Sequence, residues 1–265
     1  MATGANEEYL VIIKQSQLWK ELDAKKSSDL EKYEVKDKSK IAKIQGESEV
    51  TIQQYREKGI PETACLVPFV RKTTTKYYTK SEWYIDWSCK SVKKLKDSDG
   101  ARFQNERLYF KKGFVTDAHH GILSAALIEY SIPAVNTNLF FGTDIETELI
   151  VGFLNSSLAS YFLGKVINTS LGGMSGHATP EDIRRIPIRL PLSKIAKEEF
   201  KEIKNSIISK VNEIVKQLKK NSAADITIIQ QDIDDLVFKW FDLSDDDISL
   251  VKRYIEQKGD EKEEY

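Results

Sequence analysis

An apolar stripe near the C-terminal end of the chain constrains the fold more than any other feature. Its members lie three or four positions apart, as side chains on one face of an α-helix do. They are Phe200, Ile203, Ile207, Val211, Ile214 and Leu218. This spacing predicts a long helix over about residues 193–220. Because a continuous apolar face is unfavourable in water, the stripe must be covered by the rest of the chain or by a partner helix.

The residues after the stripe predict a helical C-terminal subdomain. Helical apolar spacing continues over residues 226–241 and 244–257, and we expect the charged tail that follows them to fray. We therefore divide the chain into residues 1–192 and residues 193–265. The second part contains the long helix and this subdomain.

Helix signals also precede the long helix. Residues 144–164 are predicted as one helix, since Thr143 and Glu146 have capping-box spacing and Gly164 can help to end it. Residues 179–182, Thr-Pro-Glu-Asp, are an N-cap, a proline and an acidic first turn, which is typical of a short helix. The prolines that follow predict an extended run.

The first part of the chain contains short β-prone segments separated by polar turns. They are residues 7–13, 65–70, 83–87, 108–110 and 132–141. Residues 14–58 are rich in Lys, Ser, Glu and Gln, and we expect helices or long polar loops there. The predicted fold class is α+β, with a twisted, mainly antiparallel sheet, bracing helices and the helical C-terminal part.

Charge is distributed unevenly along the chain. The totals, 40 Lys+Arg against 41 Asp+Glu, give a net charge of -1 and by themselves favour no nucleic-acid partner. Residues 71–112, however, contain twelve basic against five acidic residues, interleaved with aromatic ones, whereas residues 221–265 contain thirteen acidic against five basic. The sequence thus has a basic middle and an acidic tail, which we expect to lie away from DNA.

The compartment is indicated by what the sequence lacks. The two cysteines, Cys65 and Cys89, are too few for a disulfide framework and are interpreted as ordinary half-buried residues of a reducing compartment. No apolar run is long enough to cross a membrane, and the first residues lack the layout of a signal peptide. We expect a cytoplasmic protein without a membrane partner. Its abrupt start suggests a part of a longer chain.

Catalytic patterns are missing from the sequence. No (Asn/Asp)-Pro-Pro-(Tyr/Phe) loop is present, and the glycine cluster at residues 172–176 is more simply a flexible loop than a cofactor cradle. Glu-x-Lys triplets begin at Glu34, Glu199 and Glu202, but such triplets arise by chance in a chain that is 31% charged. His119 and His120 have too few neighbouring ligands for a metal site. We expect no catalytic centre, no metal site and no cofactor.

The basic, aromatic segment at residues 71–80 favours nucleic-acid contact. Lysine and arginine side chains bind phosphates, and hydroxyl groups can reach base edges. The alternative is a solvated hairpin. The predicted DNA-binding residues of this region are Arg71, Lys72, Thr74, Lys76, Tyr78, Lys80, Lys111 and Lys112.

The Gly-rich loop at residues 168–177 is a second candidate for reading DNA. Its polar side chains offer hydrogen-bond donors and acceptors, and its glycines permit a close approach of the backbone. The candidate residues are Asn168, Ser170 and His177. The alternative, a mobile linker, is weighed equally.

Five short motifs follow one another in order along the chain. They are Thr3-Gly4-Ala-Asn6-Glu-Glu-Tyr9, Leu108-Tyr109-Phe110-Lys-Lys-Gly113, Gly152-Phe-Leu154-Asn155-Ser156-Ser157, the closing segment from Thr179 to Pro191 with Asp182, Ile183, Ile186, Pro187 and Ile188, and Asp232-Ile233-Asp234-Asp-Leu236-Val237. In this order they resemble the TaqI-like C-terminal specificity domain of type II restriction-modification adenine methyltransferases. That family also looks related to recognition domains of other phage-defence methyltransferases.

The resemblance implies a role without naming the target bases. It implies that this part of the protein binds double-stranded DNA sequence-specifically and that an N-terminal methyltransferase domain of the parent chain carries the catalytic motifs. We thus expect a non-catalytic recognition module. Another hypothesis is a protein-interaction module that docks through the long helix, as the spacer helices of type I specificity subunits do. A stand-alone enzyme is a third.

Overall fold

The computed structural model has the predicted α+β class. It describes residues 10–12, 38–70, 76–79, 83–97, 103, 105–119, 122–133, 138–140, 145–167, 179–190 and 194–263. In these residues the strands form two four-stranded sheets instead of the single predicted sheet, and both contain parallel and antiparallel pairs.

The chain forms two compact units and passes between them several times. Unit 1 comprises Met1–Lys72, Lys80–Lys112 and Ile128–Thr137, and unit 2 comprises Thr73–Thr79, Gly113–Leu127 and Asn138–Tyr265. The C-terminal helices thus belong to the same unit as one of the sheets. The predicted division into residues 1–192 and 193–265 stays a prediction.

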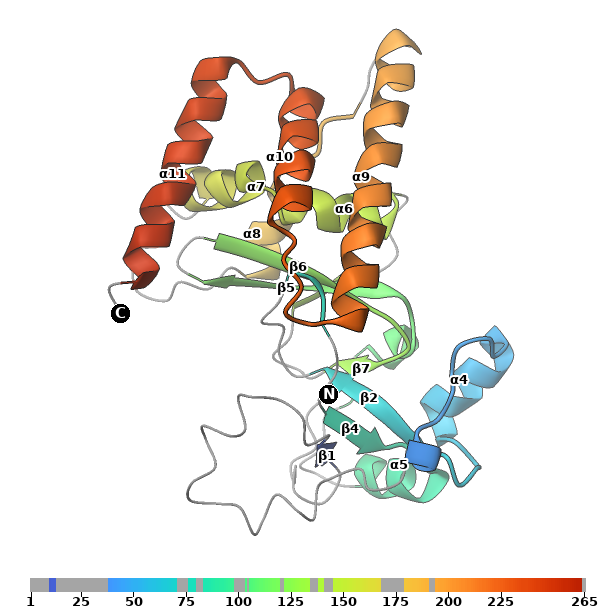
Figure 1. Cartoon of the computed structure of the whole chain (residues 1–265). Helices are drawn as coiled ribbons and strands as arrows, with labels where there is room; N and C mark the ends of the chain where they lie inside the picture. Colours follow the sequence, from blue (N-terminus) through green and yellow to red (C-terminus); the bar gives the residue numbers. More distant parts are fainter. Residues whose placement is uncertain are drawn as a thin grey trace. The chain divides into compact units, whose positions relative to one another are not determined.

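Unit 1 contains the sheet with the strand order β1-β4-β2-β7. Its elements are β1 (Leu10–Ile12), η2 (Lys38–Lys40), α4 (Glu49–Lys58), β2 (Leu66–Val70), β4 (Trp83–Asp86), α5 (Cys89–Lys96), η3 (Glu106–Leu108) and β7 (Ile132–Pro133). Strand β4 is antiparallel to both β1 and β2, and β7 is parallel to β2. Figure 1 shows α4 and α5 beside this sheet.

The core of unit 1 is built around Trp87, whose side chain is fully buried. The ring of Trp87 makes edge contacts with Tyr109 and Phe110, at centroid distances of 5.8 and 6.2 Å. Residues 108–110 were predicted as a strand, and this was wrong: they form the end of η3 and a turn in which Phe110 has a φ of 62°. The aromatic residues of this segment are buried because they pack against Trp87, and they do not pair with a strand.

Unit 2 contains the sheet with the strand order β3-β6-β5-β8. Its strands are β3 (Tyr77–Tyr78), β5 (Gly113–His119), β6 (Ile122–Ile128) and β8 (Asn138–Phe140). Strand β3 runs parallel to β6, with Tyr77 opposite Ala126, and β8 runs antiparallel to β5. The sequence prediction had assigned neither β5 nor β6. It had also combined β7 and β8 into one strand, although they belong to different sheets.

The predicted helix at residues 144–164 is divided in the structure. Its parts are α6 (Thr147–Leu154), α7 (Ser157–Phe162) and the π-helix η4 (Leu163–Ile167). The hydroxyl of Ser156 accepts a hydrogen bond from the Ala159 amide and thereby starts the second helix. Of the capping box predicted for Thr143 and Glu146, Thr143 lies outside the described residues, and Glu146 is the N-cap of α6 without a side-chain capping bond.

The later helices agree closely with the sequence prediction. They are α8 (Pro180–Arg184), α9 (Lys194–Lys220), α10 (Thr227–Phe241) and α11 (Asp245–Glu263). Thr179 and Asp182 form the complete capping box of α8. Helix α11 continues through residues that we expected to fray, up to Glu263. Figure 1 shows α9, α10 and α11 aligned in unit 2, with α6 and α7 running across them.

The apolar stripe of α9 is covered by the chain itself. Ile207, Val211 and Ile214 are completely buried and belong to the core of unit 2, together with residues of α6, β6 and α10. Gly152 of α6 permits the close approach of α9, because a Cβ atom on this glycine would lie 2.5 Å from Cγ2 of Ile207. The long helix is therefore a core element of its own unit.

Gly164 has a different role from the predicted helix end. It lies within η4, where a Cβ atom would overlap the hydroxyl oxygen of Tyr254. Lack of a side chain thus allows α11 to pack closely against this segment. No helix in the described residues is long and apolar enough to cross a membrane.

Candidate nucleic-acid interface

Most of the predicted DNA-binding residues lie outside the described residues. These are Arg71, Lys72, Thr74, Lys80, Asn168, Ser170 and His177. The described ones fall into different units: Lys76 and Tyr78 belong to unit 2, whereas Lys111 and Lys112 belong to unit 1. The contact of these residues with DNA stays a prediction.

Lys76 and Tyr78 have contacts within unit 2. The half-buried Lys76 donates a hydrogen bond from Nζ to the backbone carbonyl of Asn155, over 3.0 Å. The ring of Tyr78 packs at the edge of the core, and Nζ of Lys219 lies 5.4 Å from its centroid. These contacts give both residues a structural role. Their contact with DNA remains a prediction.

Asn155 joins three parts of unit 2. Its fully buried side chain accepts a hydrogen bond from the Ala125 amide over 2.9 Å and donates one to the Ala125 carbonyl over 2.7 Å. The amide group therefore pairs with the backbone of β6 as a neighbouring strand would. The carbonyl of Asn155 accepts hydrogen bonds from Lys76 and, over 3.3 Å, from Gln230 of α10.

A second contact fastens α7 to α10. Asp234 accepts hydrogen bonds from the amide of Ser157, over 2.7 Å, and from its hydroxyl, over 2.8 Å. Burial raises the pKa of Asp234 above its ordinary value, and the Ser157 hydrogen bonds and the nearby Lys76 ammonium only partly offset this effect. Tyr77 extends the network, since its hydroxyl donates to Gln230 over 2.7 Å.

We call this network the Asn155 cluster. It consists of Lys76, Tyr77, Asn155, Ser157, Gln230 and Asp234. The cluster brings together three sequence features that are far apart along the chain: the basic, aromatic segment, the Leu-Asn-Ser motif and the Asp-Ile-Asp-Asp motif. Because the hydroxyl of Ser157 donates directly to a carboxylate, no histidine stands between them to act as a base. The geometry indicates a framework and not a hydrolytic centre.

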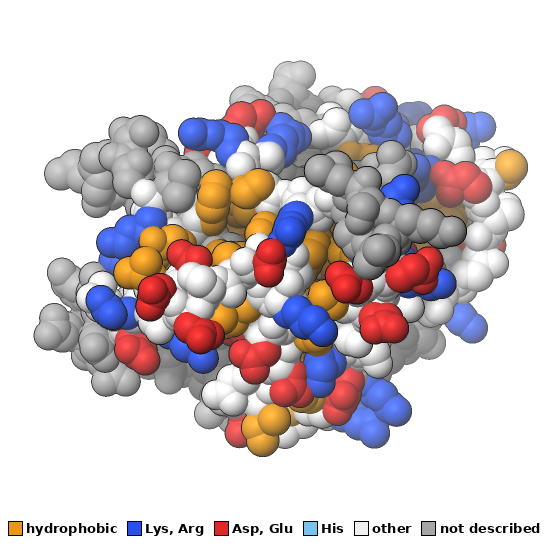
Figure 2. Space-filling view, turned by 90° about the horizontal axis from the view of Figure 1, so that it is seen from above, with side chains coloured by type: hydrophobic (Ala, Val, Ile, Leu, Met, Phe, Trp, Pro, Cys, Tyr) orange, Lys and Arg blue, Asp and Glu red, His pale blue; other side chains and the backbone are white. Residues whose placement is uncertain are grey.

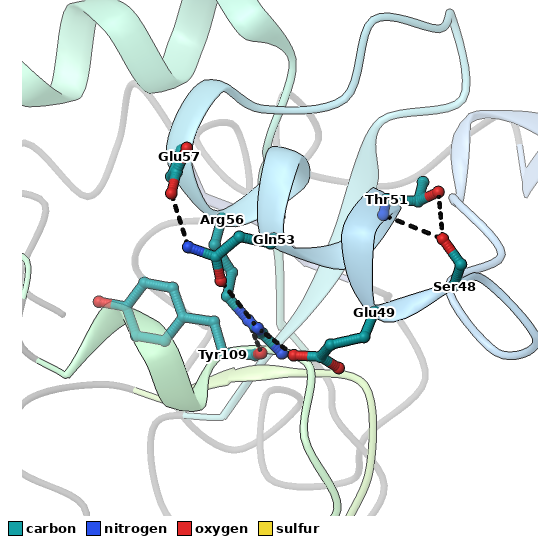
Figure 3. A network of polar contacts seen from close by, with 7 residues as sticks. All are labelled: Ser48, Glu49, Thr51, Gln53, Arg56, Glu57 and Tyr109. Atoms are coloured by element: carbon teal, nitrogen blue, oxygen red, sulfur yellow. Dashed lines mark hydrogen bonds and ion pairs between the residues drawn. The ribbon is translucent and has the colours of Figure 1, made fainter.

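Lys111 and Lys112 are exposed residues that follow η3 in unit 1. A buried arginine holds the turn before them in place. Nε of Arg56 donates to the Tyr109 carbonyl over 2.8 Å, and Nη1 donates to Glu49 over 2.7 Å (Figure 3). The guanidinium group holds the pKa of Glu49 below its ordinary value, chiefly through this hydrogen bond.

Helix α5 was not among the predicted sites, although its lysines contribute to the basic middle of the sequence. Its sequence, Cys-Lys-Ser-Val-Lys-Lys-Leu-Lys, contains four lysines and no acidic residue. The last of them, Lys96, donates to Glu106 over 2.9 Å and to the carbonyl of Glu57 over 3.0 Å. Lys93 and Lys94 follow Lys90 by three and four positions, so the three lysines lie on one side of the helix. This spacing is the sequence signal that would have identified α5 as a basic surface.

The C-terminal helices of unit 2 are rich in acidic residues. Three consecutive acidic residues, Asp245, Asp246 and Asp247, form the first turn of α11, and all are exposed. On the face shown in Figure 2, acidic and basic side chains alternate, with hydrophobic ones between them. Such a mixed surface does not favour a polyanion, whereas the lysines of α5 in unit 1 do.

Metal and thiol chemistry have little support in the described residues. No group of three or more His, Cys, Asp or Glu side chains there is placed to hold a metal ion. Both cysteines are free, but Cys89 is exposed and not half-buried as predicted. The Cys65 thiol donates to Asp86 over 3.3 Å, and burial together with this carboxylate raises the pKa of Cys65 to about 11.

Comparison of the sequence with models of known protein families finds no match, and comparison with curated proteins finds no matching relative.

Proposed function

We propose that this chain is the target-recognition part of a restriction-modification adenine methyltransferase and binds duplex DNA sequence-specifically. The observation that supports this proposal is that distant sequence motifs meet in the Asn155 cluster. Two motifs of the family resemblance, around Asn155 and Asp234, meet there and hold Lys76 and Tyr77 of the basic, aromatic segment. A recognition module requires a rigid framework beneath the segment that contacts DNA. The described contacts around Lys76 and Tyr77 have this property.

The proposal assigns the chemistry to other parts of the parent protein. An N-terminal methyltransferase domain would flip the adenine and bind the methyl donor, while this module holds the surrounding duplex. The module itself has no cofactor and acts in the cytoplasm. Titration calorimetry with S-adenosylmethionine should give no saturable binding to this chain, and saturable binding would contradict the assignment.

Selection from a random duplex library tests sequence recognition directly. The chain is immobilised, bound duplexes are recovered over several rounds at moderate salt, and their sequences are compared. A shared motif among the recovered duplexes supports the proposal. Recovery of duplexes without a shared motif contradicts it, because phosphate contacts alone bind DNA without regard to sequence.

The alternative function is docking of a partner through the long helix. The structure does not favour it, because the apolar stripe is not exposed. The stripe that a partner would need is buried in the core of unit 2, with Ile207, Val211 and Ile214 fully covered. A partner helix would have to displace α6 and α10 to reach it. Docking through another surface is not favoured by any contact in the described residues.

A further inference from the structure

The structure assigns a phosphate-binding surface to helix α5: the lysine face formed by Lys90, Lys93 and Lys94 contacts the backbone of duplex DNA. This assignment rests on the proposed function. It names a contact surface in unit 1 that lies outside the residues predicted from the sequence, and it gives that surface a specific ligand group, the phosphodiester.

The three lysines share the solvent side of the helix. Val92 and Leu95 are buried, with exposed fractions of 1% and 0%, and they fix which side of α5 faces the core. At about 100° per residue, Lys90, Lys93 and Lys94 point away from those two residues. All three are exposed. The helix therefore presents its ammonium groups together.

This arrangement of charge opposes the stability of the helix. Lys90 lies in the first turn, which has no acidic residue, although the positive end of the helix dipole is located there. Lysines three and four positions apart also repel one another. The acid closest to this turn is Asp86, whose carboxylate accepts hydrogen bonds from Ser88 and Ser91. The helix itself contains four lysines and no acidic residue, so its exposed side is cationic and complementary to a polyanion.

Other contacts hold α5 in place despite this repulsion. The hydroxyl of Ser88 accepts a hydrogen bond from the Ser91 amide at the N-cap. Asp86 accepts hydrogen bonds from the Ser88 amide over 2.8 Å and from the Ser91 hydroxyl over 2.8 Å. The cap and the buried Val92 and Leu95 therefore specify the helix, and the three lysines are not needed for it.

The dimensions suit a DNA backbone. With a rise of about 1.5 Å per residue, Lys90 and Lys94 are about 6 Å apart along the helix axis. One DNA strand carries a phosphate for about every 3.4 Å of duplex axis, so flexible lysine side chains reach neighbouring phosphates. A membrane surface fits less well, because an interfacial helix inserts its apolar face into lipid, whereas that face of α5 is already buried.

The test compares two variants of the whole chain that lose the same charge. The first is K90Q/K93Q/K94Q, since glutamine removes the charge and has a helix propensity similar to that of lysine. The matched control is K197Q/K201Q/K216Q, which changes three exposed lysines of α9 in unit 2. Binding of a fluorescein-labelled duplex of mixed sequence is measured by anisotropy over a range of salt concentrations, and thermal unfolding is measured in parallel.

We expect the slope of log affinity against log salt to become less negative by about 2 to 3 for the α5 variant and to stay unchanged for the control. Wild type then loses roughly 40-fold more affinity than the α5 variant between about 50 and 200 mM salt. The midpoint of thermal unfolding should not fall, because repulsion has been removed. If the triple variant does not fold, the single variants K90Q, K93Q and K94Q should each change the slope by about one.

Three results would overturn the assignment. If wild type binds the duplex and the α5 variant has the same slope as wild type, the lysine face is not a DNA contact. If wild type prefers anionic vesicles over the duplex and the α5 variant loses that preference, the ligand is a membrane. If wild type binds no duplex at about 50 mM salt, the proposed function itself fails.

Discussion

Asp234 of α10 accepts two hydrogen bonds from Ser157, one from its amide over 2.7 Å and one from its hydroxyl over 2.8 Å. The two residues are 77 positions apart. One carboxylate thus accepts hydrogen bonds from the first residue of α7 and holds α10 against that helix. The contact belongs to the cluster that also holds Lys76 and Tyr77, so its loss should affect the whole of unit 2.

Replacement of Asp234 should change the pH dependence of stability. The pKa of Asp234 is raised above its ordinary value of 3.8 by burial, so the folded protein binds a proton more readily than the unfolded chain. The contribution of Asp234 is therefore complete below pH 3.8 and decreases as pH rises through the raised pKa. In D234N this decrease should be absent, and the variant should gain relative to wild type over that window.

Urea unfolding at a series of pH values measures this difference. Other carboxylates with lowered pKa values, such as Asp86, have the opposite pH dependence, and subtraction of wild type from variant removes them. The control is D235N, which changes the neighbouring, exposed aspartate. Removal of both acceptors in D234A should cost roughly 1 to 3 kcal/mol, because it leaves the Ser157 groups without a partner. Identical pH profiles for D234N and D235N would contradict the expectation.

A methyl group at Gly152 should disturb the contact between α6 and α9. The Cβ atom of alanine would lie 2.5 Å from Cγ2 of Ile207 and 3.1 Å from Cγ2 of Val211. We expect Gly152→Ala to lower the free energy of unfolding by about 1 to 3 kcal/mol, as overpacking of a core does. Ile207→Leu removes the methyl group nearest to the new Cβ. The double variant should therefore be more stable than the sum of the single changes predicts, and strict additivity in this double-mutant cycle would be evidence against the clash.

Loss of Arg56 should destabilise unit 1 far more than loss of a neighbouring lysine. The Arg56 side chain is only 2% exposed and binds the Tyr109 carbonyl, Glu49 and Gln53. A lysine cannot reproduce the planar donor arrangement, so Arg56→Lys should cost about 1.5 to 3 kcal/mol in denaturant unfolding. Lys58→Ala, on the exposed side of the same helix, is the control and should have little effect. Equal effects of the two changes would mean that the network does not support the fold.

The two cysteines should react at different rates with an alkylating reagent. At pH 8 the Cys65 thiol, with a pKa of about 11 and a hydrogen bond to Asp86, is almost entirely protonated. Cys89 is exposed. Because the thiolate is the reacting form, iodoacetamide should label Cys89 first, and labelling of Cys65 should increase as pH rises toward 11. Mass spectrometry of peptides from the labelled protein measures both rates, with C65S and C89S to assign them. Faster labelling of Cys65 at pH 8 would be inconsistent with its environment.

Local patterns in the sequence predicted the helices from α8 onward well, whereas they missed α5 and the division between α6 and α7. The apolar spacing of the stripe alone predicts α9, and the Thr179–Asp182 pair predicts the start of α8, because helix periodicity and capping involve residues only three or four positions apart. The same spacing could not decide what covers the stripe. From the sequence, either the body of the protein or a partner helix could cover it. The tertiary structure decided this point, because Ile207 and Val211 pack against α6.

The candidate site depended more strongly on distant contacts. The sequence determined where positive charge is concentrated, but it did not indicate that the Lys76 ammonium binds the Asn155 carbonyl or that helix 144–164 is interrupted there. The apolar spacing of residues 149–162 continues through Asn155 and Ser156 and therefore favours one helix, although Ser156 is the kind of residue that caps a new one. At the break, the Ser156 hydroxyl caps α7 and the side-chain amide of Asn155 pairs with Ala125 of β6, a partner 30 residues away. Composition and periodicity thus determined the elements, whereas the tertiary structure decided which buried polar groups satisfy one another, since those partners are distant in the sequence.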